Sequence, residues 1–346
     1  MLRRASAVVH ATVFVAVALL ACASAAPAPP APPVESPAPV VQVPPPPPPP
    51  SADVLRARER GWGYLLDRLT ADGLPQERVA TAFADPRVPA FDGLRFNPNP
   101  RESHAAYRGL LKRRSVADAE RCAALHAGAL AAAQQETGVS AAVVAAILHV
   151  ESHCGANTGH ELVLYRLARL AMANEPHNVA ALLARLSGPD GRIDPSLADQ
   201  VRARARYLED TFYPEVRATF AVADRMAVDP LDLRGSAAGA FGLPQFLPAS
   251  YVAFGSDGDG DGRISLYDAA DAAASCARFL ASYGWKPGLT RSQQRRVIWH
   301  YNRSDAYIDT VLRLADRIER TGALHASASG GAAAAVTAAA GARGAR

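Results

Sequence analysis

The chain has 346 residues, a formal net charge of +4 and no basic block interleaved with aromatic residues, so its composition argues against a nucleic-acid partner. Arg3, Arg4, Arg343 and Arg346 lie at the two ends and account for that charge, which leaves the remainder close to neutral. With both ends set aside, about 270 residues remain, enough for one large domain or two small ones.

Residues 1–21 predict a secretion signal, because two arginines precede an apolar run at 11–21 that is too short to span a bilayer comfortably. The run ends in L-L-A-C, which resembles a bacterial lipobox and would make Cys22 the lipid-carrying first residue of the mature protein. Cleavage after the A-S-A that follows, with Cys22 discarded, is the alternative. Because Ala23 and not Asp follows Cys22, we expect a periplasmic protein attached to the outer membrane.

Residues 22–52 are expected to form a Pro-rich linker, since 27–50 contain 14 prolines and one charged residue. Such a segment favours an extended polyproline helix, which at about 3.1 Å per residue would reach about 75 Å. The folded domain is expected at 53–322, and the Ala/Gly-rich stretch 323–346 is expected to be a disordered tail.

Helical periodicity dominates the domain and strand patterns are scarce, so the expected fold class is mainly α. We find no internal repeat. Helices are expected at 54–70, 75–83, 105–113, 116–137, 141–155, 162–173, 179–186, 197–209, 214–226, 271–284, 291–301 and 307–320.

The helix expected at 141–155 carries the most informative side chain. Ser140 can cap its first turn, and Gly155 is suited to its end. Glu151 falls on the apolar stripe of this helix, four residues after Ile147. An ionised carboxylate on an apolar face loses hydration, so Glu151 needs a partner, a raised pKa or a cleft.

The stretch GSAAGAFGLPQFLPASY, residues 235–251, contains three glycines that allow the backbone to approach other groups closely. Gln245 lies there between apolar residues and two prolines, and its amide supplies both a donor and an acceptor. A tightly packed loop with a satisfied glutamine is an equally good interpretation.

The stretch DGDGDGRISLYD, residues 257–268, has acidic residues at loop positions one, three, five and twelve and Gly at six, the pattern of an EF-hand calcium loop. Asp at position twelve is shorter than the usual Glu, so Asp271 can complete the shell instead of Asp268. A single loop indicates a structural ion rather than a calcium sensor, and a solvated Gly/Asp turn is the alternative. The expected ligands are Asp257, Asp259, Asp261, the Arg263 carbonyl, Asp268 and Asp271.

The stretch WHYNRSDAYI, residues 299–308, offers Tyr301, Asn302 and Tyr307 for stacking and hydrogen bonding to a sugar face and its acetamido groups. Two aromatic residues in a core corner would explain the same pattern.

Three cysteines lie in the expected domain, and their spacing matches no zinc pattern. An oxidising compartment would allow two of them to pair. We favour Cys122 with Cys154, because both lie on helices that flank the same loop, which leaves Cys276 free.

Taken in order, these motifs resemble those of the membrane-bound lytic murein transglycosylase B family over about 53–320. The shared elements are V-E-S-x-x-G, then D-P-L-D-L-R-G-S-x-A-G-A-x-G-x-x-Q-F-x-P-x-S-Y, the acidic loop and Y-N-x-S-x-A-Y. The resemblance implies a lysozyme-like fold with one EF-hand-like calcium loop. It also implies cleavage of the β-1,4 bond between N-acetylmuramic acid and N-acetylglucosamine in peptidoglycan.

The resemblance assigns roles to individual residues. Glu151 matches the sole catalytic acid, and the acidic loop matches the metal site. One departure is the sequence N-E-P-H at 174–177, where relatives often carry a basic pair, followed by an insertion to about residue 200. The implied substrate-binding residues are Ser236, Gln245, Phe246, Tyr301, Asn302 and Tyr307.

A single glutamate without a partner carboxylate fits a substrate-assisted reaction that leaves 1,6-anhydro ends. A muramidase that uses water, or a non-catalytic peptidoglycan-binding protein, is the alternative. The expected partners are peptidoglycan strands, a membrane reached through lipid on Cys22, and enzymes of cell-wall synthesis, with no organic cofactor.

Overall fold

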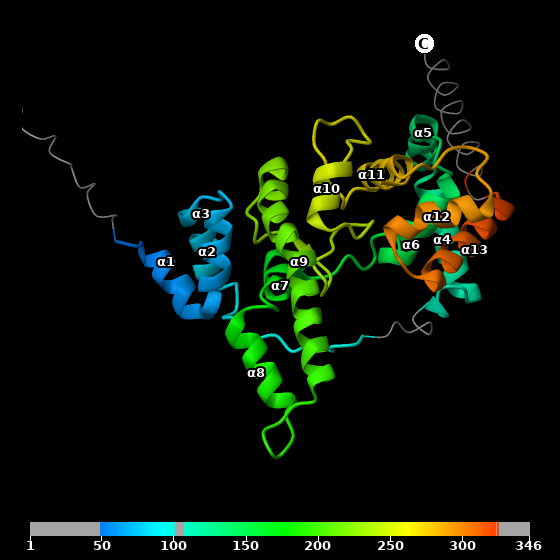
Figure 1. The fold of residues 1–346 in the computed structure, drawn as a ribbon. Helices are drawn as coiled ribbons and strands as arrows, with labels where there is room; N and C mark the ends of the chain where they lie inside the picture. The colour runs from blue at the N-terminus through cyan, green and yellow to red at the C-terminus, as the bar shows by residue number, and fades with distance from the viewer. Residues whose placement is uncertain (1–48, 101–106, 323, 325–346) are drawn as a thin grey trace, which may run out of the picture. The chain divides into compact units, whose positions relative to one another are not determined.

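The computed structural model describes residues 49–100, 107–322 and 324 (Figure 1). The expected signal and Cys22, and nearly all of the linker and tail, fall outside these residues. Within the described part of the chain, no helix is both long and apolar enough to cross a membrane.

The first described helices are α1 (Ala52–Ala57), η1 (Arg58–Trp62), α2 (Gly63–Ala71) and α3 (Gln76–Ala84). The continuous helix expected at 54–70 is therefore wrong. Gly61 interrupts it with φ of +83°, and a Cβ on Gly61 would lie 2.7 Å from the Phe91 carbonyl oxygen, so only glycine fits. The break allows Trp62 to be fully buried, with its ring 4.9 Å from that of Phe83.

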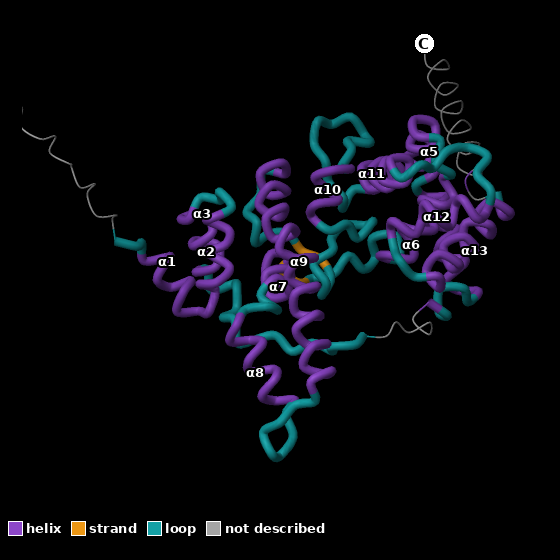
Figure 2. Tube along the Cα trace, viewed as in Figure 1, coloured by secondary structure: helices purple, strands orange, loops and turns teal. Residues whose placement is uncertain are grey.

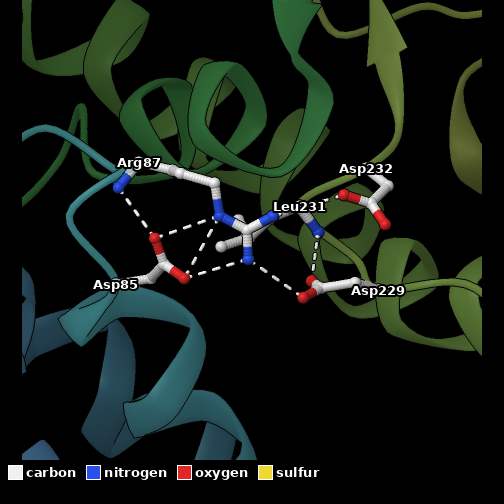
Figure 3. A network of polar contacts seen from close by, with 5 residues as sticks. All are labelled: Asp85, Arg87, Asp229, Leu231 and Asp232. Carbon is white, nitrogen blue, oxygen red and sulfur yellow. Dashed lines mark hydrogen bonds and ion pairs between the residues drawn. The ribbon is translucent and has the colours of Figure 1, made fainter.

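An ion-pair network ties the segment after α3 to the segment that leads into the Gly-rich loop (Figure 3). The Arg87 guanidinium donates to Asp85 at 2.9 Å and to Asp229 at 3.0 Å, and its other terminal nitrogen lies 3.2 Å from Asp232. The Leu231 amide in turn donates to Asp229 at 2.8 Å. The network fixes the approach to residues 234–246, although its exposure limits what it adds to stability.

Three helices form the next layer: α7 (Val163–Ala171), α8 (Pro176–Leu186) and α9 (Pro195–Met226). The two helices expected at 197–209 and 214–226 are one helix that continues through Pro214. An interior proline costs about 3 kcal/mol, but α7 and α10 (Pro248–Phe254) both pack along α9 and outweigh that cost.

The other half is built around α6 (Ala141–Ser152) (Figure 1). The helices that pack against α6 are α4 (Arg113–Leu125), α5 (Ala127–Thr137), α11 (Ala269–Ser282) and α13 (Asp305–Thr321). Ten of its twelve residues are buried, so α6 is buried on all sides rather than along one stripe. The helix expected at 116–137 is split at His126, and residues 107–112 form turns. α12 (Arg291–Tyr301) packs on α11 and α13.

A two-stranded antiparallel sheet, not expected from the sequence, joins β1 (Glu161–Leu162) to β2 (Arg234–Gly235) (Figure 2). Isolated bridges from Gly235 to Phe241 and from Phe241 to Phe246 extend the pairing. A Cβ on Gly235 would lie 2.2 Å from the Ala240 carbonyl oxygen, which confirms that glycine there allows a close backbone approach. The sheet thus places the Gly-rich loop beside the segment that follows α6.

Candidate active site

The backbone around α6 places Glu151 near the C-terminal end of a buried helix. The Ser140 hydroxyl accepts a hydrogen bond from the Val143 amide at 3.4 Å, which confirms the expected cap. After Ser152 the chain turns sharply, because His153 and Cys154 adopt left-handed φ angles of 50° and 56°. Two consecutive non-glycine residues in this region are uncommon and must be held by their surroundings.

Glu151 is half-buried, and its Oε1 accepts a hydrogen bond of 2.7 Å from the Tyr307 hydroxyl. Burial raises the pKa of Glu151 to about 7, while the bond from Tyr307 acts in the opposite direction. No ion pair reaches Glu151 from any described residue. The carboxyl can therefore hold a proton near neutral pH and can also release it.

Tyr301 and Tyr307 lie parallel, with ring centroids 6.4 Å apart and planes within 10°. The Tyr301 hydroxyl donates to the Pro244 carbonyl oxygen at 2.5 Å. Burial raises the pKa of both phenols well above 10, and the nearby Glu151 carboxylate raises it further. Tyr307 is consequently protonated at neutral pH and able to donate to Glu151.

Gln245 is held in an uncommon conformation with φ of 49°. Its side-chain nitrogen donates to the Thr158 carbonyl at 3.1 Å and to the Gly242 carbonyl at 2.8 Å. Among the described residues no donor reaches its amide oxygen, which leaves that oxygen able to accept from a ligand. A left-handed conformation costs a non-glycine residue about 1–2 kcal/mol, a cost typical of functional sites.

The other expected sugar-binding residues have different surroundings. The Ser236 hydroxyl accepts from the Ala240 amide at 3.2 Å and so closes the turn after β2. Phe246 is buried, with its ring 5.9 Å from that of Tyr301, so in this structure it supports Tyr301 from behind. Asn302 is half-buried just after α12, and no described residue bonds to its side chain.

The acidic loop brings the carboxylates of Asp257, Asp259 and Asp271 within 4.8 Å of one another. Asp271 is buried and accepts from the Gly258 amide at 2.7 Å and from the Ser265 amide at 2.6 Å. Three clustered carboxylates suit a hard divalent cation such as calcium. The loop is also tied to the Gly-rich segment, because the Leu243 amide donates to the Leu266 carbonyl at 2.7 Å.

Two other acids of this loop lie outside that group. Asp268 caps α11 by accepting from the Ala270 amide at 2.7 Å, and Asp261 accepts from the Arg263 amide at 2.7 Å. The carboxylate of Asp271, and not that of Asp268, lies in the group of three, and the role of either residue as a metal ligand stays a prediction.

The expected disulfide is confirmed: Cys122 on α4 is bonded to Cys154, with Cα atoms 6.2 Å apart. It joins α4 to the left-handed turn after Glu151. Cys276 is buried and free.

The sequence analysis did not single out His149, which is buried on α6 and lies 2.8 Å from the Ser115 hydroxyl. Burial lowers the pKa of His149 to about 4, so this second link between α4 and α6 is neutral.

The sequence profile of the "Transglycosylase SLT domain" family matches residues 59–294. Over 160 residues the chain is 32% identical to the membrane-bound lytic murein transglycosylase B of Escherichia coli (strain K12). That match covers 46% of this chain and 36% of the relative, so the chain spans about a third of the relative's length.

Two crystal structures are similar in fold. The soluble lytic transglycosylase SltB1 from Pseudomonas aeruginosa gives a TM-score of 0.57 at 24% identity, covering 75% of this chain and 99% of that one. The Escherichia coli lytic transglycosylase Slt35 in complex with calcium gives a TM-score of 0.53 at 21% identity, and the match covers 77% of this chain and 93% of that one. The expected mainly helical, lysozyme-like fold is thereby confirmed. Because the family profile matches well over half of the sequence, the chain belongs to the transglycosylase SLT domain family, as its resemblance to the transglycosylase B group predicted.

Proposed function

We propose that this protein is a lytic transglycosylase that cleaves the β-1,4 bond between N-acetylmuramic acid and N-acetylglucosamine and leaves 1,6-anhydro ends. The observation that carries the proposal is Glu151 itself, a half-buried carboxyl with a pKa raised to about 7 and a tyrosine hydroxyl on its Oε1. A group with this pKa can act first as an acid and then as a base at neutral pH.

In the proposed reaction, protonated Glu151 donates its proton to the glycosidic oxygen as the bond from C1 to that oxygen breaks. The N-acetyl carbonyl of the muramic acid supports the positive charge that develops at C1. Ionised Glu151 then takes the proton of the C6 hydroxyl, whose oxygen attacks C1 and closes the anhydro ring. Water is not consumed, and Glu151 ends in its starting protonation state. Tyr307 stabilises the ionised form between the two steps through its hydrogen bond.

The residues around Glu151 are proposed to hold the sugars. The free amide oxygen of Gln245 is suited to accept from an acetamido N–H or a hydroxyl. The half-buried Asn302 offers an amide to which no described residue bonds, and Ser236 fixes the turn after β2. The half-buried ring of Tyr301 is proposed to face a sugar, with Tyr307 stacked parallel to it and the buried Phe246 supporting it from behind.

The acidic loop is proposed to bind a structural calcium ion through Asp257, Asp259 and Asp271. Asp261 and the Arg263 carbonyl are close in sequence and would complete the shell after a small rearrangement. The ion would stiffen the loop on which Leu266 supports the Gly-rich segment, and so would act on the site indirectly.

Attachment to the outer membrane through lipid on Cys22, facing the periplasm, is proposed from the L-L-A-C sequence. Such an anchor would bring the domain within reach of peptidoglycan and of cell-wall synthesis enzymes. Cell fractionation of Cys22→Ser tests it: the variant should move to the soluble fraction, and an unchanged membrane association would contradict lipidation.

Digestion of purified sacculi tests the activity. The native chain should release muropeptides whose masses are one water lower than those of hydrolysed ends, and Glu151→Gln should release none. Products with reducing ends would instead identify a muramidase. Sacculus binding without any release would identify a non-catalytic binding protein.

A further inference from the structure

The outer side of α12 and the adjoining end of α11 carry exposed aromatic and basic side chains outside the site described above. Trp299 is 43% exposed and Tyr283 is 41% exposed, so both present large ring faces to solvent. His300 stacks on Tyr283 with centroids 4.3 Å apart and planes within 13°. We call Tyr283, Lys286, Arg296, Trp299 and His300 the α12 strip.

Two surface cavities lie along this strip. One, of about 390 Å³, lies between α12 and the start of α13 and includes Trp299 and Asp305. The other, of about 380 Å³, lies beside Tyr283 and Lys286. Both are lined in part by Arg296 and His300, so they adjoin. The strip therefore offers an elongated binding face, which suits an extended polymer better than a compact small molecule.

The charges of the strip favour an anionic ligand. Arg295, which also borders the first cavity, is paired with Asp305 and Asp309. Arg296 donates only to the Ser292 hydroxyl, at 3.2 Å, and neither it nor Lys286 has an acidic partner within the described ranges. Two unpaired cations beside exposed rings are the groups needed to hold carboxylates next to a ligand with flat apolar faces.

The strip lies directly behind the candidate active site. Phe279 on α11 contacts Tyr301 on one side, at 4.9 Å between ring centroids, and Tyr283 on the other, at 4.8 Å. Trp299 and Tyr301 belong to the same last turn of α12. A polymer held on the strip would thus remain close to Glu151.

We propose that the α12 strip is a second binding site for peptidoglycan, separate from the cleft at Glu151; this rests on the proposed function. The apolar faces of sugar rings stack on Trp299 and on the Tyr283–His300 pair, as exposed aromatic rings with polar neighbours allow. The carboxylates of the peptide stems pair with Arg296 and Lys286. The site holds the enzyme on the sacculus while the cleft engages a strand.

Binding is best measured in the full chain carrying Glu151→Gln, so that no strand is cut during the experiment. Co-sedimentation with purified sacculi should show about tenfold weaker binding when Trp299→Ala is added, a change of about 1.4 kcal/mol. Tyr207→Ala is the matched control, because Tyr207 is 53% exposed on α9, away from the strip. Trp299→Phe keeps a ring and should retain most of the binding.

A double variant distinguishes the contribution of the positive charges to binding from that of ring stacking. Lys286→Gln with Arg296→Gln should weaken binding to intact sacculi and reduce its dependence on salt. The same pair should leave binding unchanged for chitin oligosaccharides, whose N-acetylglucosamine units carry no carboxylate. Trp299→Ala should weaken binding to both.

Equal sacculus binding by Trp299→Ala and Tyr207→Ala would overturn the proposal. So would a loss of turnover by Trp299→Ala on a short soluble muropeptide, since that would place Trp299 in the catalytic cleft. The experiments can refute the proposed activity and the proposed second binding site independently of each other. Sacculus binding that depends on Trp299 without muropeptide release by the native chain would refute only the activity, whereas normal release with unchanged binding would refute only the strip.

Discussion

The Tyr307 hydroxyl donates a hydrogen bond of 2.7 Å to Oε1 of Glu151, and this bond joins α13 to the buried helix α6. Burial alone would drive the carboxyl toward the protonated form, and the tyrosine offsets part of that effect by stabilising the ionised form. As a result, the Glu151 carboxyl can be protonated or ionised near neutral pH. A single residue that serves first as the acid and then as the base needs both forms.

Removing the Tyr307 hydroxyl should change the pKa of Glu151. In Tyr307→Phe the ionised carboxyl loses its donor, so the pKa of Glu151 rises and the alkaline limb of the kcat profile moves to higher pH. Turnover at neutral pH should fall about ten- to hundredfold, since a hydrogen bond to a charged group contributes about 1.5–3 kcal/mol. Tyr213→Phe is the control, because Tyr213 donates at 2.8 Å to Asp72, elsewhere in the protein. An alkaline limb that moves to lower pH would contradict the assignment.

Glu151 should also lower the free energy of unfolding of the protein at high pH. Its pKa is about 7 in the folded protein against 4.5 as the ordinary value, so below pH 4.5 the group is protonated in both states and there is no penalty. As pH rises from 4.5 to 7, the unfolded carboxyl ionises first and folding loses up to about 3 kcal/mol.

Glu151→Gln removes this penalty. Urea unfolding should therefore show the variant more stable than the native chain at pH 8, with the difference much smaller at pH 4. Glu136→Gln, which changes an exposed carboxyl on α5, should show no such contrast between the two pH values. A native chain that is the more stable of the two at pH 8 would mean that Glu151 is not buried as described.

The Cys122–Cys154 disulfide should stabilise both the fold and the turn after Glu151. It closes a loop with a sequence separation of 32, for which the loss of chain entropy in the unfolded state corresponds to about 3.5 kcal/mol. The double variant Cys122→Ser with Cys154→Ser should unfold at a lower temperature, and kcat should fall because the left-handed turn is released. Reductant should lower the melting temperature of the native chain but not of the double variant; equal responses would argue against the bond.

Two aspartates of the acidic loop should respond differently to calcium. Asp259→Asn should abolish the rise in melting temperature that calcium gives the native chain, yet match the native chain in chelator, because Asp259 is exposed. Asp271→Asn should be less stable with or without calcium, since both Asp271 oxygens accept backbone amides. A native melting temperature that is unchanged by chelator would contradict the calcium proposal.

Local sequence signals predicted much of this fold. Ser140 caps α6 because a serine hydroxyl can reach the amide three residues on, and α12 begins and ends where its pattern does. The disulfide followed from two cysteines that flank one loop. The cap and the helix bounds depend on residues close together in the chain, whereas the disulfide, with a sequence separation of 32, followed from the chemistry of cysteine pairing.

The predictions that were wrong concern features that depend on contacts between residues far apart in the sequence. Gly61 breaks a regular helical pattern because of Phe91, thirty residues away, and Pro214 is tolerated because of packing on α9. The pairing of β1 with β2 joins two-residue strands too short to give a periodic signal. Tyr307 was expected to contact sugar, and no spacing in the sequence shows that its hydroxyl reaches Glu151 across 156 positions.

The most direct test of the central claim is titration of Glu151 itself. Carboxyl ¹³C chemical shifts of glutamate-labelled protein, with Glu151→Gln used to assign the resonance, give the midpoint without any substrate. We predict a midpoint near pH 7, as a general acid that later serves as base requires. A midpoint near 4.5 would show an ordinary, solvated carboxylate with no proton to give at neutral pH, and the proposed mechanism would be wrong.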